Sequence, residues 1–413
     1  MLVAGLLGSC GSTRIGKTAK SFQKELGQPK DATHFMGILV YDPETKDTLF
    51  AKDHHRYFTP ASNVKIFTLY TALHLLPERL PALRYHNSGG VLQIMGTGDP
   101  TLFHPEFETK GVIALLQSAD TVQVYLENYK GNPFMPGWAW EDYDAYFSPE
   151  VGPLPLYGNT VEIRPTEPLT IVPDYFRPLV ARGTSKFRRA RRHNRFLVSP
   201  ELRDTLRIPF MTSAELTLKL LQEKVSVPVV TNDIPPSSPL DTLWGNPTDS
   251  VVHHMLLKSD NFLAEQLALT TSSQLGDTLD FTRLRTHMLN GPLSDLKHKP
   301  RWVDGSGLSR YNLFTPTSMV QVLEKLWIEF DRRRVLTLMP AWDQDGTKSK
   351  TDQDDFIWAK SGYVGNNYNL SGYIKTKSGK VLLFSFMNNH YLDPTASIRE
   401  RMYRCLRLLH QSY

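Results

Sequence analysis

Hydrophobic and polar positions follow a strand pattern near both ends of the chain. Residues 34–53, "HFMGILVYDPETKDTLFAKD", contain a β-rich run, an Asp-Pro turn and a returning apolar segment. Residues 369–390 have the same pattern, with a Lys-Ser-Gly-Lys turn between two apolar runs. Each segment therefore predicts a β-hairpin. An antiparallel sheet built from the two ends of the chain, with helices on its faces, is the predicted architecture.

Apolar residues at helical spacing predict four helices, which lie within residues 60–76, 248–269, 314–330 and 394–413. The region between 77 and 244 differs, because it has many prolines, short β-like segments and turn clusters. We therefore predict an α/β (α+β) protein. Residues 28–76 and 245–413 are expected to form one domain, and residues 77–244 a β-rich inserted region.

The composition is that of a globular protein with enough apolar material for more than one core. The chain has 413 residues, of which 40% are hydrophobic and 22% charged, and a net charge of +5. Six Lys or Arg residues fall within twelve positions in "SKFRRARRHNRF" (185–196). This basic run fits either association with an anionic polymer or lipid, or a solvated loop. No aromatic-interleaved RNA motif or zinc-finger spacing accompanies it, so no nucleic-acid partner is expected.

The two cysteines, Cys10 and Cys405, exclude a disulfide framework and argue against a metal site. Cys405 lies in an amphipathic stretch and is predicted to be a small core residue. Residues 7–10, Leu-Gly-Ser-Cys, resemble the lipobox of bacterial lipoproteins, in which the cysteine is acylated after the signal is cut. We expect a truncated signal at residues 1–10, a linker at 11–27 and a lipid anchor on Cys10. The alternative is a plain N-terminal tail, since the apolar segment is short and lacks a positive start.

The first predicted helix begins with residues that can do acyl-transfer chemistry. In "TPASNVKIFTLYTALHLL" (59–76), Ser62 and Lys65 are three positions apart and share one helix face. A lysine whose pKa is lowered by burial or nearby positive charge can act as the general base for a serine hydroxyl. The pair alone also fits a helix-start serine beside an exposed lysine, so the interpretation depends on the rest of the chain.

Two further motifs follow along the chain. The first is Ser-Asp-Asn, just inside a predicted helix, and the second is Lys-Ser-Gly, ahead of the C-terminal hairpin. Their residues are Ser259, Asp260, Asn261, Lys360, Ser361 and Gly362. Ser-x-x-Lys, Ser-Asp-Asn and Lys-Thr-Gly together are the signature of penicillin-binding proteins and class A β-lactamases. Serine in place of threonine keeps the hydroxyl group, so the chain resembles these enzymes.

The spacing of the motifs indicates which group of penicillin-binding proteins the chain resembles. Lys65 and Ser259 are separated by 193 residues, and a long β-rich insertion at that place resembles the class C low-molecular-mass penicillin-binding proteins. This is the D-alanyl-D-alanine carboxypeptidase/endopeptidase family. The segments "GTGDPTL" (96–102), "GWAWEDYDAYF" (137–147) and "VDGSGLSRYNLFTP" (303–316) are also similar to it. The resemblance implies a β-lactamase/transpeptidase-like fold.

The resemblance also implies a role for each catalytic residue. Ser62 would attack the carbonyl group between two D-alanines and form an acyl-enzyme, while Lys65 takes its proton. Ser259 would relay a proton toward the departing amine. Asn261 would hydrogen-bond both Lys65 and the substrate amide.

The third motif is implied to bind the substrate, through Lys360, Ser361, Gly362 and Tyr363. Lys360 would add positive charge that keeps Lys65 neutral and attracts the terminal carboxylate, and Ser361 would hydrogen-bond that carboxylate. The backbone N–H groups of Ser62 and Tyr363 would form the oxyanion hole. Tyr363 departs from the family pattern, which usually has a small hydroxyl residue at this position.

The predicted function is a serine DD-peptidase that acts on peptidoglycan stem peptides and is acylated by β-lactams. We expect it in the cell envelope, on the periplasmic side, without a cofactor or metal. One alternative is a β-lactamase, which differs in fast deacylation. Another is a wall-binding lipoprotein that kept the motifs and lost turnover. Carboxypeptidase and endopeptidase action are both compatible with the sequence.

Overall fold

The computed structural model describes residues 20–26, 34–348, 350 and 352–413. Cys10 and the predicted lipobox lie outside the described residues. The chain divides into two compact units, which are described separately below. The first unit comprises residues up to Ile66, Asp295–Trp302 and Asn312–Tyr413, and the second comprises Phe67–Ser294 and Val303–Tyr311.

The first unit contains a five-stranded antiparallel sheet with strand order β15-β16-β17-β1-β2. Its strands are β1 (Phe35–Asp42), β2 (Asp47–Lys52), β15 (Ile357–Val364), β16 (Asn367–Lys375) and β17 (Val381–Asn389). The hairpin β1-β2 and the hairpin β16-β17 join through β1 and β17, in a register that runs from Phe35 opposite Asn389 to Tyr41 opposite Leu383. The predicted sheet formed from both ends of the chain is confirmed. The third motif forms strand β15 at the edge of this sheet, which the sequence pattern did not show.

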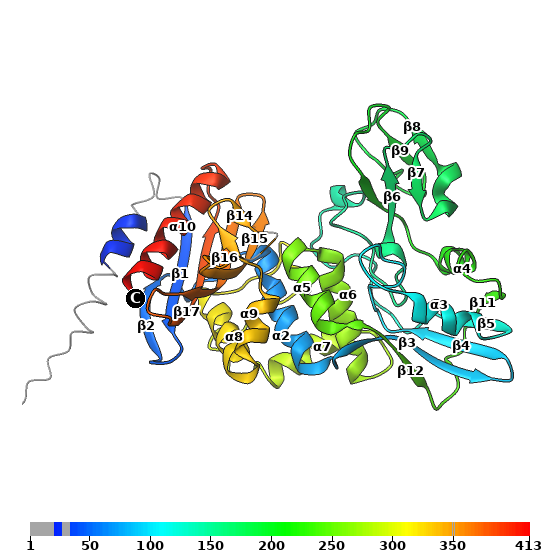
Figure 1. The fold of residues 1–413 in the computed structure, drawn as a ribbon, viewed down its shortest axis with the longest axis horizontal. Coiled ribbons are helices and arrows are strands. Elements are labelled where there is room, and N and C mark those ends of the chain that lie inside the picture. Colours follow the sequence, from blue (N-terminus) through cyan, green and yellow to red (C-terminus); the bar gives the residue numbers. More distant parts are fainter. Residues whose placement is uncertain (1–19, 27–33, 349, 351) are drawn as a thin grey trace, which may run out of the picture. The chain divides into compact units, whose positions relative to one another are not determined.

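Helices cover both faces of this sheet (Figure 1). The unit contains α8 (Pro316–Glu329), α9 (Arg332–Leu338) and α10 (Thr395–Ser412), together with the short strands β13 (Trp342–Asp343) and β14 (Gly346–Thr347). On one face, Ile38, Phe384 and Phe386 join a core with Met402 and Cys405 of α10. Cys405 is therefore a core residue, as predicted. On the other face, α8 packs against β1 and β17, and the Tyr373 hydroxyl donates to the Leu323 carbonyl oxygen at 2.8 Å.

The second unit contains the predicted β-rich region. A five-stranded sheet has the order β11-β5-β4-β3-β12, a three-stranded sheet has the order β10-β6-β7, and β8 pairs with β9. The strands are β3 (Arg79–Ser88), β4 (Val91–Gly96), β5 (Thr121–Tyr125), β6 (Thr160–Arg164), β7 (Thr170–Val172), β8 (Val180–Arg182), β9 (Phe196–Val198), β10 (Leu206–Pro209), β11 (Val229–Thr231) and β12 (Asp241–Pro247). The helices are α3 (Lys110–Gln117), α4 (Ala214–Gln222), α5 (Thr248–Lys258), α6 (Asn261–Ser272) and α7 (Phe281–Asn290).

The boundaries of the two compact units differ from those of the predicted domains. Helices α5 to α7 group with the β-rich region, and the Gln266 side chain on α6 donates to the carbonyl oxygens of Gly98 and Gly152. The predicted layout of 28–76 plus 245–413 around an insertion at 77–244 stays a prediction.

The expectation of one helix over residues 248–269 was wrong. Ser259 adopts a left-handed conformation, with φ 53° and ψ 36°, and ends α5. The Asp260 carboxylate then accepts a hydrogen bond from the Leu263 N–H at 2.9 Å and caps a new helix, α6. The Ser-Asp-Asn motif is therefore the junction between two helices.

Candidate active site

The candidate nucleophile and its partner lie at the start of α2 (Lys65–Leu75) in the first unit. Ser62 belongs to a 3-10 turn, Ala61–Val64, and the Lys65 ammonium group donates to the Ser62 hydroxyl oxygen at 3.0 Å. Lys65 is fully buried, whereas Ser62 is partly exposed. Ala61 has a φ of +48°, a left-handed conformation that is costly for a residue with a side chain. The turn thus presents a reachable hydroxyl in front of a desolvated amine.

Asn63 fixes this turn to the sheet, and the sequence analysis missed it. Its side-chain amide donates to the Lys360 carbonyl oxygen at 2.8 Å, and its oxygen accepts from the Ser371 hydroxyl at 2.6 Å. The Asn369 side chain donates to the Thr59 carbonyl oxygen at 2.9 Å. These contacts join residues about 300 positions apart in sequence. A buried asparagine next to the nucleophile was the available signal, but nothing in the sequence indicated its partners.

Lys360 brings a second buried ammonium group into the same region. It is 1% exposed, and its ammonium group donates to the Ser361 carbonyl oxygen at 2.8 Å. Burial, together with the charge of Lys65, holds the pKa of Lys360 well below its ordinary value. Each ammonium charge disfavours the other, so the arrangement disfavours the state in which both lysines are charged. A neutral amine beside Ser62 is what general-base chemistry requires.

Gly362 lies in the closest contact between β15 and the nucleophile turn. A Cβ atom at this position would lie 2.5 Å from the Pro60 carbonyl oxygen, 2.9 Å from the Ser62 nitrogen and 3.0 Å from the Asn63 nitrogen. These are backbone atoms, which cannot rotate away. The site therefore depends on glycine at position 362.

The outer edge of β15 presents the remaining predicted groups. The Ala359 N–H bonds to the Pro340 carbonyl oxygen outside the sheet ladder, so the N–H of Tyr363, four positions later, also points away from β16. The Tyr363 side chain is 61% exposed. The Ser361 hydroxyl lies 3.2 Å from the hydroxyl of Thr347 in β14. Thr347 thus adds a second hydroxyl that the sequence analysis did not include.

Ser259 and Asn261 belong to the second unit. The Asn261 side-chain amide donates to the Phe147 carbonyl oxygen at 3.0 Å, and Ser259 ends α5. The structure therefore brings together Ser62, Lys65, Lys360, Ser361, Gly362 and Tyr363. The approach of Ser259 and Asn261 to Ser62 stays a prediction.

A buried carboxyl group supports the helix that Asn261 begins. Glu265, on α6, accepts the N–H groups of Gly305 at 2.9 Å and Ser306 at 2.8 Å. Burial, with the nearby charge of Asp304, raises the pKa of Glu265 to about 8. Asp304 in turn accepts a hydrogen bond from the Trp138 indole N–H at 3.0 Å. The segment 303–309 is therefore bound to α6 at Glu265, which lies four positions after the last residue of the Ser-Asp-Asn motif.

Two features of the described residues bear on cofactors and membranes. No cluster of three or more His, Cys, Asp or Glu side chains suited to a metal ion occurs in residues 20–26, 34–348, 350 and 352–413. Over the same residues, no helix combines the length and apolar character needed to cross a bilayer.

A serine, its buried lysine partner and a second lysine on the edge strand of an antiparallel sheet define the penicillin-binding class of serine acyltransferases. Comparison with known proteins gives the family. The model of the D-Ala-D-Ala carboxypeptidase 3 (S13) family matches residues 18–172 and 211–408, and the chain belongs to this family. Membership confirms the predicted resemblance and the enzyme class, serine-type D-Ala-D-Ala carboxypeptidases.

Individual relatives agree with this assignment. The chain is 29% identical over 160 residues to D-alanyl-D-alanine carboxypeptidase DacB of Haemophilus influenzae, covering 35% of this chain and 32% of that protein. The match thus spans about a third of this curated relative. Penicillin binding protein 4 (dacB) of Haemophilus influenzae has a similar structure, with a TM-score of 0.72, 18% identity, and coverage of 95% of this chain and 99% of that one.

A second solved structure has the same fold at lower similarity. The predatory peptidoglycan endopeptidase Bd3459 of Bdellovibrio bacteriovorus gives a TM-score of 0.51 and 14% identity, over 91% of this chain and 93% of that one. At these identities the structural matches show the fold alone. They confirm the predicted mixed α/β class, with an antiparallel sheet flanked by helices.

Proposed function

We propose that this chain hydrolyses D-Ala-D-Ala-type bonds in peptidoglycan stem peptides through an acyl-enzyme on Ser62. The observation that carries the proposal is the 3.0 Å contact between the buried Lys65 ammonium nitrogen and the Ser62 hydroxyl oxygen. Lys360 supports it, because a second buried positive group disfavours protonation of the first. Family membership supplies the substrate class.

The proposed reaction has two halves. Lys65 takes the hydroxyl proton as the Ser62 oxygen bonds to the substrate carbonyl carbon, and the backbone N–H groups of Ser62 and Tyr363 stabilise the oxyanion. The carbon–nitrogen bond then breaks, and the proton passes to the departing amine, with Ser259 as the proposed relay. Water hydrolyses the ester and restores Ser62. A β-lactam would acylate Ser62 by the same attack, with opening of its ring.

Substrate binding is proposed to use the edge of β15. Lys360 supplies positive charge for the terminal carboxylate, and the Ser361 hydroxyl, beside that of Thr347, supplies hydrogen bonds to it. A carboxypeptidase would release a terminal D-alanine, and an endopeptidase would cut a cross-link that ends in the same D-centre.

A fluorescent penicillin tests the proposal directly. Wild-type protein should form a long-lived adduct, Ser62→Ala should form none, and Ser378→Ala, in the exposed turn between β16 and β17, should label normally. Both variants should melt as wild type does. Rapid release of the label would indicate a β-lactamase, and no labelling of wild type would indicate a binding protein without turnover. Mass spectrometry of a soluble D-Ala-D-Ala peptide and a cross-linked muropeptide separates the two hydrolytic activities.

We also propose that the mature protein is attached on the periplasmic side of the cell envelope through a lipid on Cys10. The support is the Leu-Gly-Ser-Cys sequence at residues 7–10. Metabolic labelling with radioactive palmitate should mark the wild-type protein and not Cys10→Ala. Equal labelling of both would refute the anchor.

A further inference from the structure

One segment of the second unit is left out by the family match. The match stops at residue 172 and resumes at residue 211. The intervening segment contains the basic run at 185–196 and the parallel pair β8 and β9, which lies in the green part of the ribbon beside β6 and β7 (Figure 1). The family model therefore assigns nothing to this segment.

A pocket of about 610 Å³ lies in this segment. Part of its lining is apolar and comes from the two strands and the turn before β8, including Leu179, Val180 and Phe196. Three arginines, Arg189, Arg191 and Arg195, complete it. No acidic side chain is among its lining residues. A pocket with three positive groups and no negative one is suited to an anion.

Arg189 is the unusual member of this set. It is 3% exposed, and its guanidinium group lies over the Tyr143 ring at 5.1 Å from the ring centroid. One nitrogen, Nη2, donates to the Tyr143 carbonyl oxygen at 2.9 Å. The other two, Nε and Nη1, are buried and have no hydrogen-bond partner among the described residues. Buried N–H groups of an arginine are costly to leave unpaired.

The carboxylates of Asp144 and Glu150, whose charges act on the Arg189 side chain, accept hydrogen bonds from backbone N–H groups, which for Asp144 include the Arg189 N–H at 3.4 Å. An Asp144 oxygen accepts the Arg188 N–H at 2.6 Å, and a Glu150 oxygen accepts the Thr212 N–H at 2.7 Å. Both lower the electrostatic cost of burying Arg189, but neither forms an ion pair with its guanidinium group in the described residues. The basic run is therefore more than a solvated loop, because one of its arginines is built into the wall of a pocket.

We propose that this pocket binds a phosphate group carried on a partly apolar molecule. A phosphate offers three or more acceptor oxygens and more than one negative charge, so it can engage Arg189 together with the exposed Arg191 and Arg195. A carboxylate has only two acceptor oxygens and one negative charge, so it matches three arginines less fully than a phosphate does. The apolar part of the lining suits the glycerol, sugar or acyl portion that carries the phosphate. This proposal is independent of the chemistry at Ser62.

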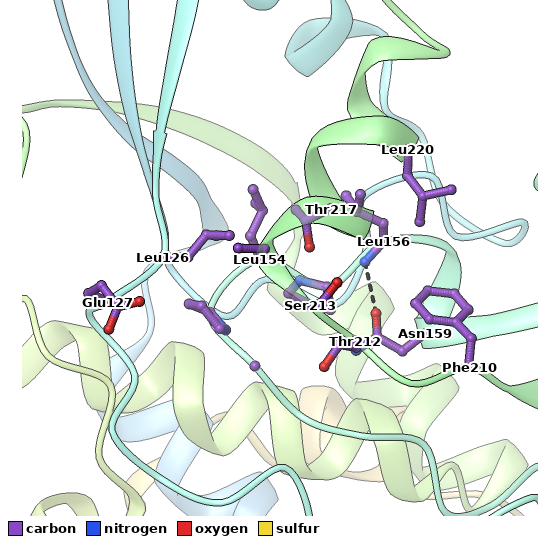
Figure 2. A pocket seen from close by; sticks show the side chains of 14 residues that line it. Leu126, Glu127, Leu154, Leu156, Asn159, Phe210, Thr212, Ser213, Thr217 and Leu220 are labelled. Carbon is purple, nitrogen blue, oxygen red and sulfur yellow. Dashed lines mark hydrogen bonds between the residues drawn. The ribbon is translucent and has the colours of Figure 1, made fainter. Parts of the chain in front are cut away.

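A second cavity in the same unit differs from the pocket around Arg189, because its buried polar group has hydrogen-bond partners. Figure 2 shows a hollow of about 200 Å³ lined by side chains such as Leu126, Leu154 and Phe210. Its polar member Asn159 is already satisfied, since it accepts from the Leu156 N–H at 3.2 Å and donates to the Glu150 carbonyl oxygen at 2.8 Å. In the pocket lined by Arg189, Arg191 and Arg195, by contrast, one lining side chain, that of Arg189, has two buried nitrogen atoms without a hydrogen-bond partner among the described residues.

The test compares two double variants with the same loss of charge. Arg191→Gln with Arg195→Gln changes the pocket lining, whereas Arg188→Gln with Arg192→Gln changes the same run outside it. Arg189→Met removes the buried N–H groups at similar side-chain length. The probes are inorganic phosphate, glycerol 3-phosphate, and vesicles of phosphatidylglycerol and phosphatidylcholine against vesicles of phosphatidylcholine alone. Binding is measured by calorimetry and vesicle sedimentation at fixed ionic strength, and the melting temperature and penicillin labelling report folding.

We expect Arg189→Met and the lining double variant to weaken binding about tenfold or more, and the matched double variant to stay within about twofold of wild type. Binding of vesicles alone would identify a lipid headgroup as the phosphate source, and binding of glycerol 3-phosphate would identify a soluble or polymeric ester. Equal loss in the two double variants would overturn the proposal in favour of diffuse attraction. No binding of any probe to wild type would also overturn it. If Arg189→Met does not fold, Arg189→Lys is used in its place. This variant keeps the positive charge but lacks the guanidinium N–H groups.

Discussion

Replacing Gly362 by alanine should damage the active site through backbone geometry alone. The new Cβ atom would lie 2.5 Å from the Pro60 carbonyl oxygen and 2.9 Å from the Ser62 nitrogen. An ordinary contact between the new Cβ atom and the Pro60 carbonyl oxygen would be about 3.4 Å long. To reach it, β15 and the nucleophile turn would have to separate by about 0.9 Å. A misplacement of about 1 Å costs on the order of 100-fold in rate. Overpacking of this kind costs about 1–3 kcal/mol of the free energy of unfolding.

The assay is the second-order rate of acylation by a fluorescent penicillin, with urea denaturation of the same samples. Gly111→Ala is the matched control, because its Cβ would meet nothing within 4 Å and its position in α3 favours alanine over glycine. We expect the control to acylate normally and to be as stable as wild type or slightly more so. An acylation rate for Gly362→Ala within about twofold of wild type, with unchanged stability, would refute the reasoning.

Three further predictions concern the lysines and the asparagine of the site. Lys65→Arg should remain folded and lose acylation by several orders of magnitude, because arginine does not deprotonate in proteins; near-normal labelling kinetics would exclude Lys65 as the base. Folded Lys360 has a pKa below its ordinary 10.5, so the unfolded chain binds more protons, and wild-type stability gains a contribution as pH rises through that interval. The stability of Lys360→Met relative to wild type should therefore fall as pH rises in urea titrations, and a pH-independent difference would count against a buried, depressed lysine. Asn63→Ala should lower the free energy of unfolding by about 1–3 kcal/mol and slow acylation, because it leaves the Lys360 carbonyl oxygen and the Ser371 hydroxyl without this partner. Ser371→Ala, which keeps the bond to Lys360, should cost less, and equal losses would contradict this assignment.

Much of the first unit could be predicted from local patterns. The hairpins β1-β2 and β16-β17 and the helices α8 and α10 each result from periodicity and turn residues within a short window, and each lies where the sequence predicts it. The helix break at Ser259 was missed, because the apolar spacing continues across it. Aspartate is a residue type that caps helix starts, so Asp260 could have indicated the break. The pattern of apolar residues alone did not show it.

The sequence by itself determined the chemical groups of the candidate site and their order along the chain. Ser62, Lys65 and the Lys-Ser-Gly motif could be recognised because acyl-transfer chemistry demands particular residue types at particular spacings. The tertiary structure decided which backbone atoms surround these groups: the Asn63 side chain on the Lys360 carbonyl oxygen, Gly362 against Pro60, and the unpaired guanidinium nitrogens of Arg189. The reason is physical, since such contacts depend on how whole strands and turns pack across hundreds of residues, and local preferences act over only a few.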